Sequence, residues 1–331
     1  MPNHKDVVVG VDMGGTSLRA LVVNAANEIL AVEKTSTDIT QKPDRMIADL
    51  AGWIEDVVRE AGIKRSTLAA VSIGAPGAVD PERGIVYHAP NLGWDKVALG
   101  PTLARLARVP VLVENDVNVG VAGEYALGAG QGARILVGIF VGTGIGGGIL
   151  FDGQLYSGSR GAAAEIGHNV LLVDGPRCGC GNRGCAEALA SRTAMERDVR
   201  AAIKHGERSI VPKLMRERAK DRMTSSIIQR ALKKHDPVMQ KVMKRAEYYL
   251  GILVANVVNT LDPDCVVIGG GIAERLGEAF VAPIRHTAYE CFLRRHDAER
   301  VRIVPGALGD NAGPLGAVVL ARQRLKIASR N

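Results

Sequence analysis

The sequence of 331 residues is 47% hydrophobic and 23% charged, with a formal net charge of +7. These values are typical of a globular protein with room for about two domains. No apolar run approaches the roughly 18 residues of a membrane span, and no signal peptide precedes the first apolar segment. We therefore expect a cytoplasmic protein without a membrane partner.

The excess positive charge lies mainly between residues 192 and 245. The basic residues of this region are interleaved with Glu and Asp at helical spacing, which is typical of a solvated helix face. Aromatic residues make up only 4% of the chain, which disfavours base stacking. We expect no nucleic-acid partner.

The chain opens with an apolar strand over residues 7–11, a turn that reads D-M-G-G-T-S, and a second strand over residues 18–23. Glycines in such a hairpin let phosphate oxygens approach the backbone N–H groups, and a carboxylate at the strand end can hold Mg²⁺. An ordinary hairpin turn is the alternative. The candidate phosphate-binding residues here are Asp12, Gly14, Gly15, Thr16 and Ser17.

A helix is expected over residues 43–61, because Pro43 opens it and Gly62 follows its end. A strand over residues 68–73 then leads to a rigid Gly-Pro-Gly turn. Asn91 lies near Trp94 in a Gly-bounded loop, an amide beside an aromatic ring that suits a polyol. A surface turn is the commoner explanation of this pattern alone.

The segment E-N-D-V-N begins at Glu114, between a short strand over residues 111–113 and a helix over residues 117–127. Asn115 and Asp116 therefore stand at a strand-to-helix junction, where polar side chains reach the mouths of clefts. A plain helix N-cap is the alternative, since Asn and Asp are the residues that most often cap helices.

A second strand–glycine–strand unit follows, with strands over residues 135–141 and 149–151. The turn between them contributes Gly142, Thr143 and Gly144 as candidate phosphate contacts. It is neither a Walker A loop nor a Rossmann loop, because it lacks the Lys of the first and the following helix of the second. The repetition predicts a duplicated architecture with two phosphate hairpins that face one cleft.

Residues 192–262 read as helical, with breaks near Pro212 and Pro237. A strand over residues 265–268 ends in Gly269, Gly270 and Gly271, a further site for close backbone approach. The last expected strand covers residues 301–305, and a terminal helix runs to about residue 327.

Three cysteines, Cys178, Cys180 and Cys185, crowd into one Gly-rich loop shortly after His168. One His and three Cys make the closed tetrahedral set of a structural zinc site. A reduced, metal-free turn is the alternative. Cys265 and Cys291 stand alone and are expected to be buried thiols.

Taken together and in this order, the motifs at Asp12, Glu114, Gly142, Glu165 (E-I-G-H) and Cys178 (C-G-C-G-N-R-G-C-A-E) resemble the ROK family of bacterial sugar kinases and repressors, especially its glucokinases. The resemblance implies an α/β, actin/hexokinase-like (ribonuclease H-like) two-domain fold with a central cleft. Residues 1–115 would form a small α/β domain, completed by the C-terminal helix at about 312–331. Residues 116–311 would form a large α/β domain that carries the zinc loop.

The resemblance also implies roles for individual residues. Asp116 matches the catalytic base. Sugar contacts are implied for Asn91, Asn115, Asp116, Glu165, His168 and Glu187, and zinc ligands for His168, Cys178, Cys180 and Cys185. The loops at Gly14 and Gly142 match those that hold the ATP phosphates. Two departures from the family pattern are Ala164, where Gly is common, and the order Asp310-Asn311, where Asn-Asp is frequent.

The expected reaction is ATP-dependent phosphorylation of a hexose at its 6-hydroxyl, with glucose as the first choice, Mg²⁺ on ATP and Zn²⁺ in a structural role. Mannose, fructose, N-acetylglucosamine or N-acetylmannosamine remain as alternative substrates, and polyphosphate as an alternative donor. A sugar-responsive repressor is disfavoured because the first phosphate loop begins at Asp12, leaving no winged helix ahead of it. A pure sugar-binding module would not need two phosphate hairpins. A homo-oligomer, dimer or tetramer, is expected.

Overall fold

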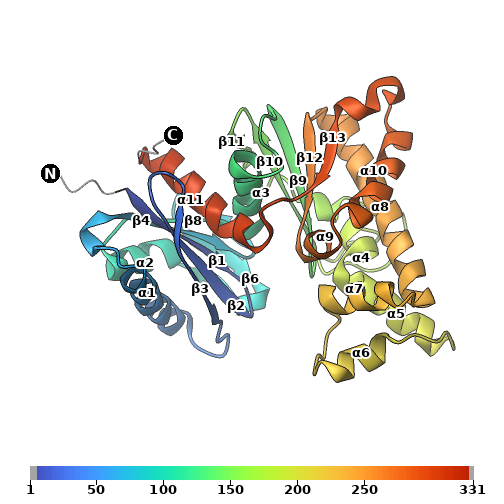
Figure 1. Cartoon of the computed structure of the whole chain (residues 1–331), viewed down its shortest axis with the longest axis horizontal. Helices are drawn as coiled ribbons and strands as arrows, with labels where there is room; N and C mark the ends of the chain where they lie inside the picture. Colours follow the sequence, from blue (N-terminus) through green and yellow to red (C-terminus); the bar gives the residue numbers. More distant parts are fainter. Residues whose placement is uncertain (1–5, 328–331) are drawn as a thin grey trace. The chain divides into compact units, whose positions relative to one another are not determined.

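A computed structural model describes residues 6–327. The chain forms two compact α/β units (Figure 1). Unit 1 contains the chain up to Gln131, the segment Ser157–Ala163 and the chain from Asp310 onward. Unit 2 contains Gly132–Tyr156 and Ala164–Gly309. The expected α/β two-domain fold is confirmed.

Unit 1 is built on a five-stranded sheet with the order β3-β2-β1-β4-β8. Its strands are β1 (Val7–Met13), β2 (Ser17–Val23), β3 (Ile29–Ser36), β4 (Leu68–Ala75) and β8 (Val111–Asn115). The first three pair antiparallel, whereas β1, β4 and β8 run parallel. The carboxyl ends of β1, β4 and β8 therefore lie at one edge of the sheet.

Helices cover both faces of this sheet (Figure 1). Alternate residues of β1, Val7, Val9 and Val11, join the core beneath α1 (Pro43–Glu60) and α2 (Leu99–Ala107). On the other face, Gly10 lies against α11 (Ala312–Leu325), where an added Cβ would come within 2.0 Å of the Pro314 carbonyl oxygen. Residues 7–11 of this strand are all apolar or Gly, as expected for a strand covered on both faces.

Helix α3 (Asp116–Leu127) packs against α11 at a very short distance. A Cβ on Gly316 would lie 1.6 Å from the Val119 carbonyl oxygen, and one on Gly123 would lie 2.4 Å from the Ala312 carbonyl oxygen. The sequence-based boundary was drawn after residue 115. The structural division instead keeps α3 in unit 1, because this glycine contact binds it to the C-terminal helix.

Unit 1 also contains a small antiparallel sheet that the sequence patterns did not predict. Its strands are β5 (Ala78–Asp80), β6 (Ile85–Ala89) and β7 (Trp94–Val97). The region was interpreted as turns because its strands are only three to five residues long. Strands that short do not show a clear period of two.

Unit 2 repeats the strand order of unit 1, as β11-β10-β9-β12-β13. The strands are β9 (Ile135–Val141), β10 (Ile145–Phe151), β11 (Gln154–Leu155), β12 (Cys265–Gly269) and β13 (Arg302–Pro305). Again the first three pair antiparallel and the last two continue the sheet in parallel. The predicted duplication is therefore present in the sheets.

The longest of the described helices, α8 (Pro237–Leu261), packs against four other helices of unit 2, α4 (Ala186–Ala190), α5 (Arg192–Lys204), α7 (Ser225–Lys233) and α10 (Glu278–Cys291). The others are α6 (Val211–Glu217) and α9 (Gly271–Leu276). Pro212 and Pro237 lie in the first turns of α6 and α8, so they mark helix starts. Within residues 6–327, no helix combines the length and apolarity that crossing a membrane requires.

Candidate active site and metal centre

Two carboxylates stand at the carboxyl edge of the unit 1 sheet. Asp12 lies near the end of β1, and Asp116 is the first residue of α3, directly after β8. Strand β4 runs between them, and Gly74 is its residue in register with Asp12. A Cβ on Gly74 would meet the Val119 side chain at 2.4 Å and the Asp116 Cα at 3.3 Å. Glycine at this position lets α3 begin close to the strand ends.

Burial and neighbouring carboxylates raise the pKa of both groups. Burial, followed by the charge of Asp12, raises the pKa of Asp116 to about 7. Burial, followed by the charge of Asp310, raises the pKa of Asp12 to about 6, against the opposing effect of Arg19 and Lys34. Carboxyls with such pKa values can exchange protons near neutral pH, as a general base must.

Asp310 was not among the predicted site residues. It lies in the turn Gly309–Asn311 that precedes α11, and its neighbour Asn311 accepts two hydrogen bonds from the Arg19 guanidinium, at 2.7 and 3.1 Å. In the sequence, Asp310 is an acidic residue just before a helix, the same arrangement as at Asp116. The sequence pattern identified it only as a departure from the family pattern.

Asn115 caps α3. Its Oδ1 accepts hydrogen bonds from the backbone N–H groups of Val117 (2.9 Å) and Asn118 (3.1 Å), and its Nδ2 donates to the Gly77 carbonyl. Asp116 uses one carboxylate oxygen to accept from the Val117 N–H, at 2.9 Å. The cap therefore exists, and it fixes the direction of the Asp116 side chain rather than replacing its chemistry.

Glu114, the residue before this cap, is only 3% exposed. Its Oε1 accepts from the Asn115 N–H and from Asn118 Nδ2, and its Oε2 is paired with Arg324 of α11. The Asn115–Asp116 junction is thus tied to the C-terminal helix by an ion pair that the sequence alone did not reveal.

The first glycine turn lies beside Asn91. A Cβ on Gly15 would come within 2.9 Å of the Asn91 carbonyl oxygen. The Gly14 N–H donates to the Ser17 carbonyl at 2.9 Å, and the exposed Thr16 accepts from the Thr37 N–H through its carbonyl. Unit 1 thus brings all its predicted residues to the ends of β1, β4 and β8 or to the adjacent loops.

In unit 2, the two remaining glycine segments meet. Strands β9 and β12 are parallel neighbours, with Gly269 in register with Phe140. Residues 142–144 and residues 269–271 therefore leave the sheet side by side. The packing is tight, since a Cβ on Gly270 would lie 2.5 Å from the Val141 carbonyl oxygen. The two glycine segments, each predicted separately to approach phosphate, therefore lie at one edge of the unit 2 sheet.

Glu187, at the start of α4, connects this edge to the cysteine loop. Its Oε2 accepts from the Ile145 N–H at 3.0 Å, and its Oε1 lies 3.6 Å from Cys178 Sγ. A Cβ on Gly144 would overlap with the same carboxylate at 2.2 Å. The predicted sugar contact Glu187 is held between the hairpin and the thiols.

The four predicted metal ligands converge. The ligand atoms of His168, Cys178, Cys180 and Cys185 all lie within 4.8 Å of one another. Cys180 and Cys185 are 3.7 Å apart at their sulfurs, and Cys178 Sγ is 3.6 Å from His168 Nδ1. A tetrahedral Zn²⁺ with Zn–S bonds of about 2.3 Å places its sulfurs about 3.8 Å apart. The cluster fits a closed zinc site.

Burial disfavours the thiolate form at two of the three cysteines. Burial raises the pKa of the Cys178 thiol to about 12, and it raises the pKa of Cys185, whereas a backbone N–H of Asn182 lowers the pKa of Cys180. Thiolates at the two buried positions need a positive charge beside them.

His168 has two directions of contact. Its Nδ1 faces Cys178, while its Nε2 lies 4.0 Å from Glu165, whose side chain is 68% exposed. One imidazole can therefore serve a metal through Nδ1 and present Nε2 on the side of Glu165. This arrangement is compatible with both roles that were expected for His168.

The sequence model of the ROK family matches residues 8–324 of this chain. The chain belongs to the ROK family. A glucokinase of Thermotoga maritima is 34% identical over 326 residues, which cover 98% of this chain and 99% of the relative. A xylose repressor of Caldicellulosiruptor bescii is 30% identical over 321 residues, covering 96% of this chain and 79% of the relative.

Among solved structures, a ROK family glucokinase from Streptomyces griseus in complex with glucose and AMPPNP is similar, with a TM-score of 0.81 and 32% identity. The match covers 96% of this chain and 99% of that chain. ROK relatives therefore include both sugar kinases and repressors, and the fold is common to them.

Proposed function

We propose that this ROK protein is an ATP-dependent hexose kinase that phosphorylates the 6-hydroxyl of glucose, with Asp116 as the general base. The similarity to glucokinases over nearly the whole chain supports the sugar kinase class. The observation that carries the proposal is the carboxyl of Asp116, whose pKa is raised to about 7 by burial and by Asp12.

A sugar hydroxyl is a poor nucleophile until a base accepts its proton. A base with a pKa near the working pH combines a useful unprotonated fraction with adequate basicity. In the proposed reaction, the free oxygen of Asp116 accepts the proton of the 6-hydroxyl as the hydroxyl oxygen attacks the terminal phosphorus of ATP. The bond between that phosphorus and the bridging oxygen breaks, and ADP leaves with the bridging oxygen. The N–H of Val117 holds the other oxygen. Asp12, with its neighbour Asp310, is the proposed site for the Mg²⁺ of the nucleotide.

Asn91, Asn115, Glu165, His168 and Glu187 are the proposed sugar contacts. Their task is to hold the sugar, since positioning contributes about 7–11 kcal/mol to such reactions and proton transfer about 10²–10⁴ in rate. The glycine-rich backbone at Gly14 and at residues 142–144 and 269–271 is proposed to receive the phosphates and adenosine. A zinc ion in the cysteine cluster would fix the loop that carries His168 and Glu187.

The proposal is tested with a panel of hexoses and N-acetylhexosamines, by ADP release with ATP as donor and by sugar phosphate formation with polyphosphate as donor. We expect turnover with ATP and the highest kcat/KM with glucose. A higher value for another sugar would change the substrate but keep the class. Sugar binding without any ADP release would overturn the kinase and favour a sugar-responsive regulator, as the xylose repressor relative suggests.

Asp95→Asn is a matched control for the role of Asp116. Asp95 is an exposed carboxylate in β7 of the same unit, so its replacement makes the same chemical change away from the predicted site. Activity of this variant should equal that of the wild type.

A further inference from the structure

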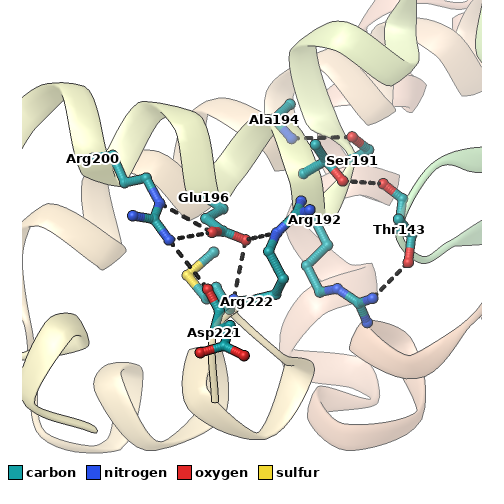
Figure 2. Close-up of polar contacts among 10 residues, drawn as sticks. Thr143, Ser191, Arg192, Ala194, Glu196, Arg200, Asp221 and Arg222 are labelled. Carbon is teal, nitrogen blue, oxygen red and sulfur yellow. Dashed lines mark hydrogen bonds and ion pairs between the residues drawn. The ribbon is translucent and has the colours of Figure 1, made fainter. Parts of the chain in front are cut away.

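An arginine at the start of α5 lies against the second glycine hairpin of unit 2. Ser191 ends α4 and caps α5, because its hydroxyl accepts from the Ala194 N–H at 3.1 Å. This corner is 2% exposed at Ser191 and directs the next two residues to the turn between β9 and β10. Figure 2 shows the Arg192 side chain extending toward Thr143.

Four hydrogen bonds join the start of α5 to this turn. The Arg192 N–H donates to the Gly142 carbonyl at 3.0 Å, and the Thr143 carbonyl accepts from the Thr193 N–H at 3.4 Å and from the Thr193 hydroxyl at 2.8 Å. The fourth comes from the guanidinium itself, whose Nη2 donates to the Thr143 hydroxyl oxygen at 2.6 Å. The cation is thereby fixed beside the backbone that is expected to meet phosphate.

Arg192 differs from its arginine neighbours in its ion pairing. Glu196 lies one turn further along α5, is 6% exposed, and accepts from Arg200 through Oε1 and from Arg222 through Oε2 (Figure 2). Its Oε2 also accepts from the Met223 N–H. This carboxylate is thus occupied by two ion pairs, with Arg200 and with Arg222.

Arg192 has no such partner. Within the described residues 6–327, no carboxylate oxygen lies within 4.0 Å of its guanidinium, although the side chain is partly buried. Burial, and after it the charge of Arg222, lowers the pKa of Arg192, and the charge of Glu196 opposes this effect without forming an ion pair. A partly buried guanidinium with unused N–H donors favours an anion that has several oxygens.

We propose that Arg192 and the Thr143 hydroxyl together bind the polyphosphate chain of the nucleotide, so that the second hairpin recognises phosphate through a side-chain cation as well as through its backbone. This inference rests on the proposed kinase function for the identity of the nucleotide. The hydroxyl of Thr143 accepts from Arg192, which leaves its own hydrogen to be donated to a phosphate oxygen. Replacing Arg192 should therefore weaken the binding of ligands that carry phosphates and leave the binding of the nucleoside unchanged.

Calorimetric binding of ATP, ADP, inorganic tripolyphosphate and adenosine to Arg192→Met tests this. We expect the Kd values of ATP, ADP and tripolyphosphate to rise about tenfold or more, the usual loss for a charge-assisted hydrogen bond. The Kd values of adenosine and glucose should stay within twofold of wild type. Arg192→Lys should lose less, because it keeps the charge but not the planar fork.

Two control variants separate phosphate binding from a structural role. Arg200→Met removes an arginine of the same helix that does not contact the hairpin and should leave all four affinities unchanged. Thr193→Val removes a bond to the same turn without removing the cation. If Thr193→Val reproduces the whole effect of Arg192→Met, Arg192 only supports the turn and the inference is overturned.

The outcomes also distinguish this inference from the proposed function. If wild type phosphorylates a hexose and Arg192→Met binds ATP within twofold, the phosphate role is refuted alone. If wild type turns over no sugar but Arg192→Met loses tripolyphosphate affinity, the anion site stands and the kinase proposal falls. Absence of both ATP and tripolyphosphate binding in wild type would overturn both.

Discussion

The two units share one sheet topology and differ in the chemistry at its carboxyl edge. In unit 1, the edge formed by β1, β4 and β8 carries the acids Asp12 and Asp116. In unit 2, the corresponding strands β9 and β12 lead into glycines, and Arg192 and Glu187 are charged residues that hydrogen-bond to the hairpin there. The sheet determines where functional groups gather, and the residues after each strand determine what those groups can do.

The units also differ in how their loops are fixed. Unit 1 fixes its Asn115–Asp116 junction with the C-terminal helix, through the Glu114–Arg324 pair and the glycine contact between α3 and α11. Unit 2 instead has a cysteine loop between β11 and α4, which a metal ion can hold. One junction depends on packing from a distant part of the chain, and the other on local ligands.

Asp116→Asn should have the largest effect among these variants, because it removes the proposed general base of unit 1. The amide keeps the shape and the hydrogen bond to Val117 but cannot accept a proton. We expect kcat to fall by about 10² or more with sugar affinity within threefold of wild type. Turnover within threefold of wild type would remove Asp116 from the role.

Metal removal tests how unit 2 fixes its cysteine loop, in contrast to the packing that fixes the junction of unit 1. Protein purified without added metal should contain one Zn²⁺ per chain, and Cys180→Ser should lower that content. We expect the sugar KM to rise about tenfold, with a smaller effect on ATP affinity, because the ligands fix the loop that bears His168. Cys265→Ser, at a thiol outside the cluster, is the control. Full activity at a zinc content near zero would support the metal-free turn.

The ion pair in unit 1 should contribute to stability. Arg324→Met leaves Glu114 buried beside only its hydrogen-bond donors, and we expect the free energy of unfolding to fall by about 2 kcal/mol, since Arg324 is partly exposed. Arg45→Met, which breaks the exposed pair with Asp49, should cost no more than about 0.5 kcal/mol. Denaturant unfolding measures the loss of stability in both variants. Equal losses would show that the buried pair stabilises the protein no more than the exposed pair does.

The raised carboxyl pKa values also predict how stability depends on pH. The folded state binds protons at Asp116 up to a pKa of about 7, whereas the ordinary value is 3.8. The folded protein therefore holds more protons between these values, and its stability falls as pH rises from about 4 to 7. Asp116→Asn should remove part of this slope and stabilise the protein by about 1 kcal/mol at pH 8. Parallel curves of melting temperature against pH for the two proteins would contradict it.

Much of this could be predicted from the sequence, because the decisive signals are local. Apolar runs that end in Asp-x-Gly-Gly or Gly-Thr-Gly specify strand and turn together, and Asp116 was placed correctly at a strand-to-helix junction. The cysteine spacing confined four ligands to one loop, which the structure brings within 4.8 Å.

The rest depends on contacts between distant parts of the chain. Arg324 and Glu114 are 210 residues apart in sequence, and the charge effect of Asp310 on Asp12 also spans most of the chain. Arg192 lies in a helical region rich in basic residues, where nothing in the pattern distinguishes it from the arginines that pair with Glu196. The small sheet of β5, β6 and β7 was missed because its strands are too short for periodicity.

The pH dependence of kcat/KM for glucose tests the central claim most directly. If Asp116 is the base and its pKa is about 7, kcat/KM should fall tenfold for each pH unit below that value and be constant above it. The limb should be absent from the residual activity of Asp116→Asn. A profile that stays flat from pH 5 to pH 8, or the same limb in the variant, would contradict the assignment of Asp116 as the base.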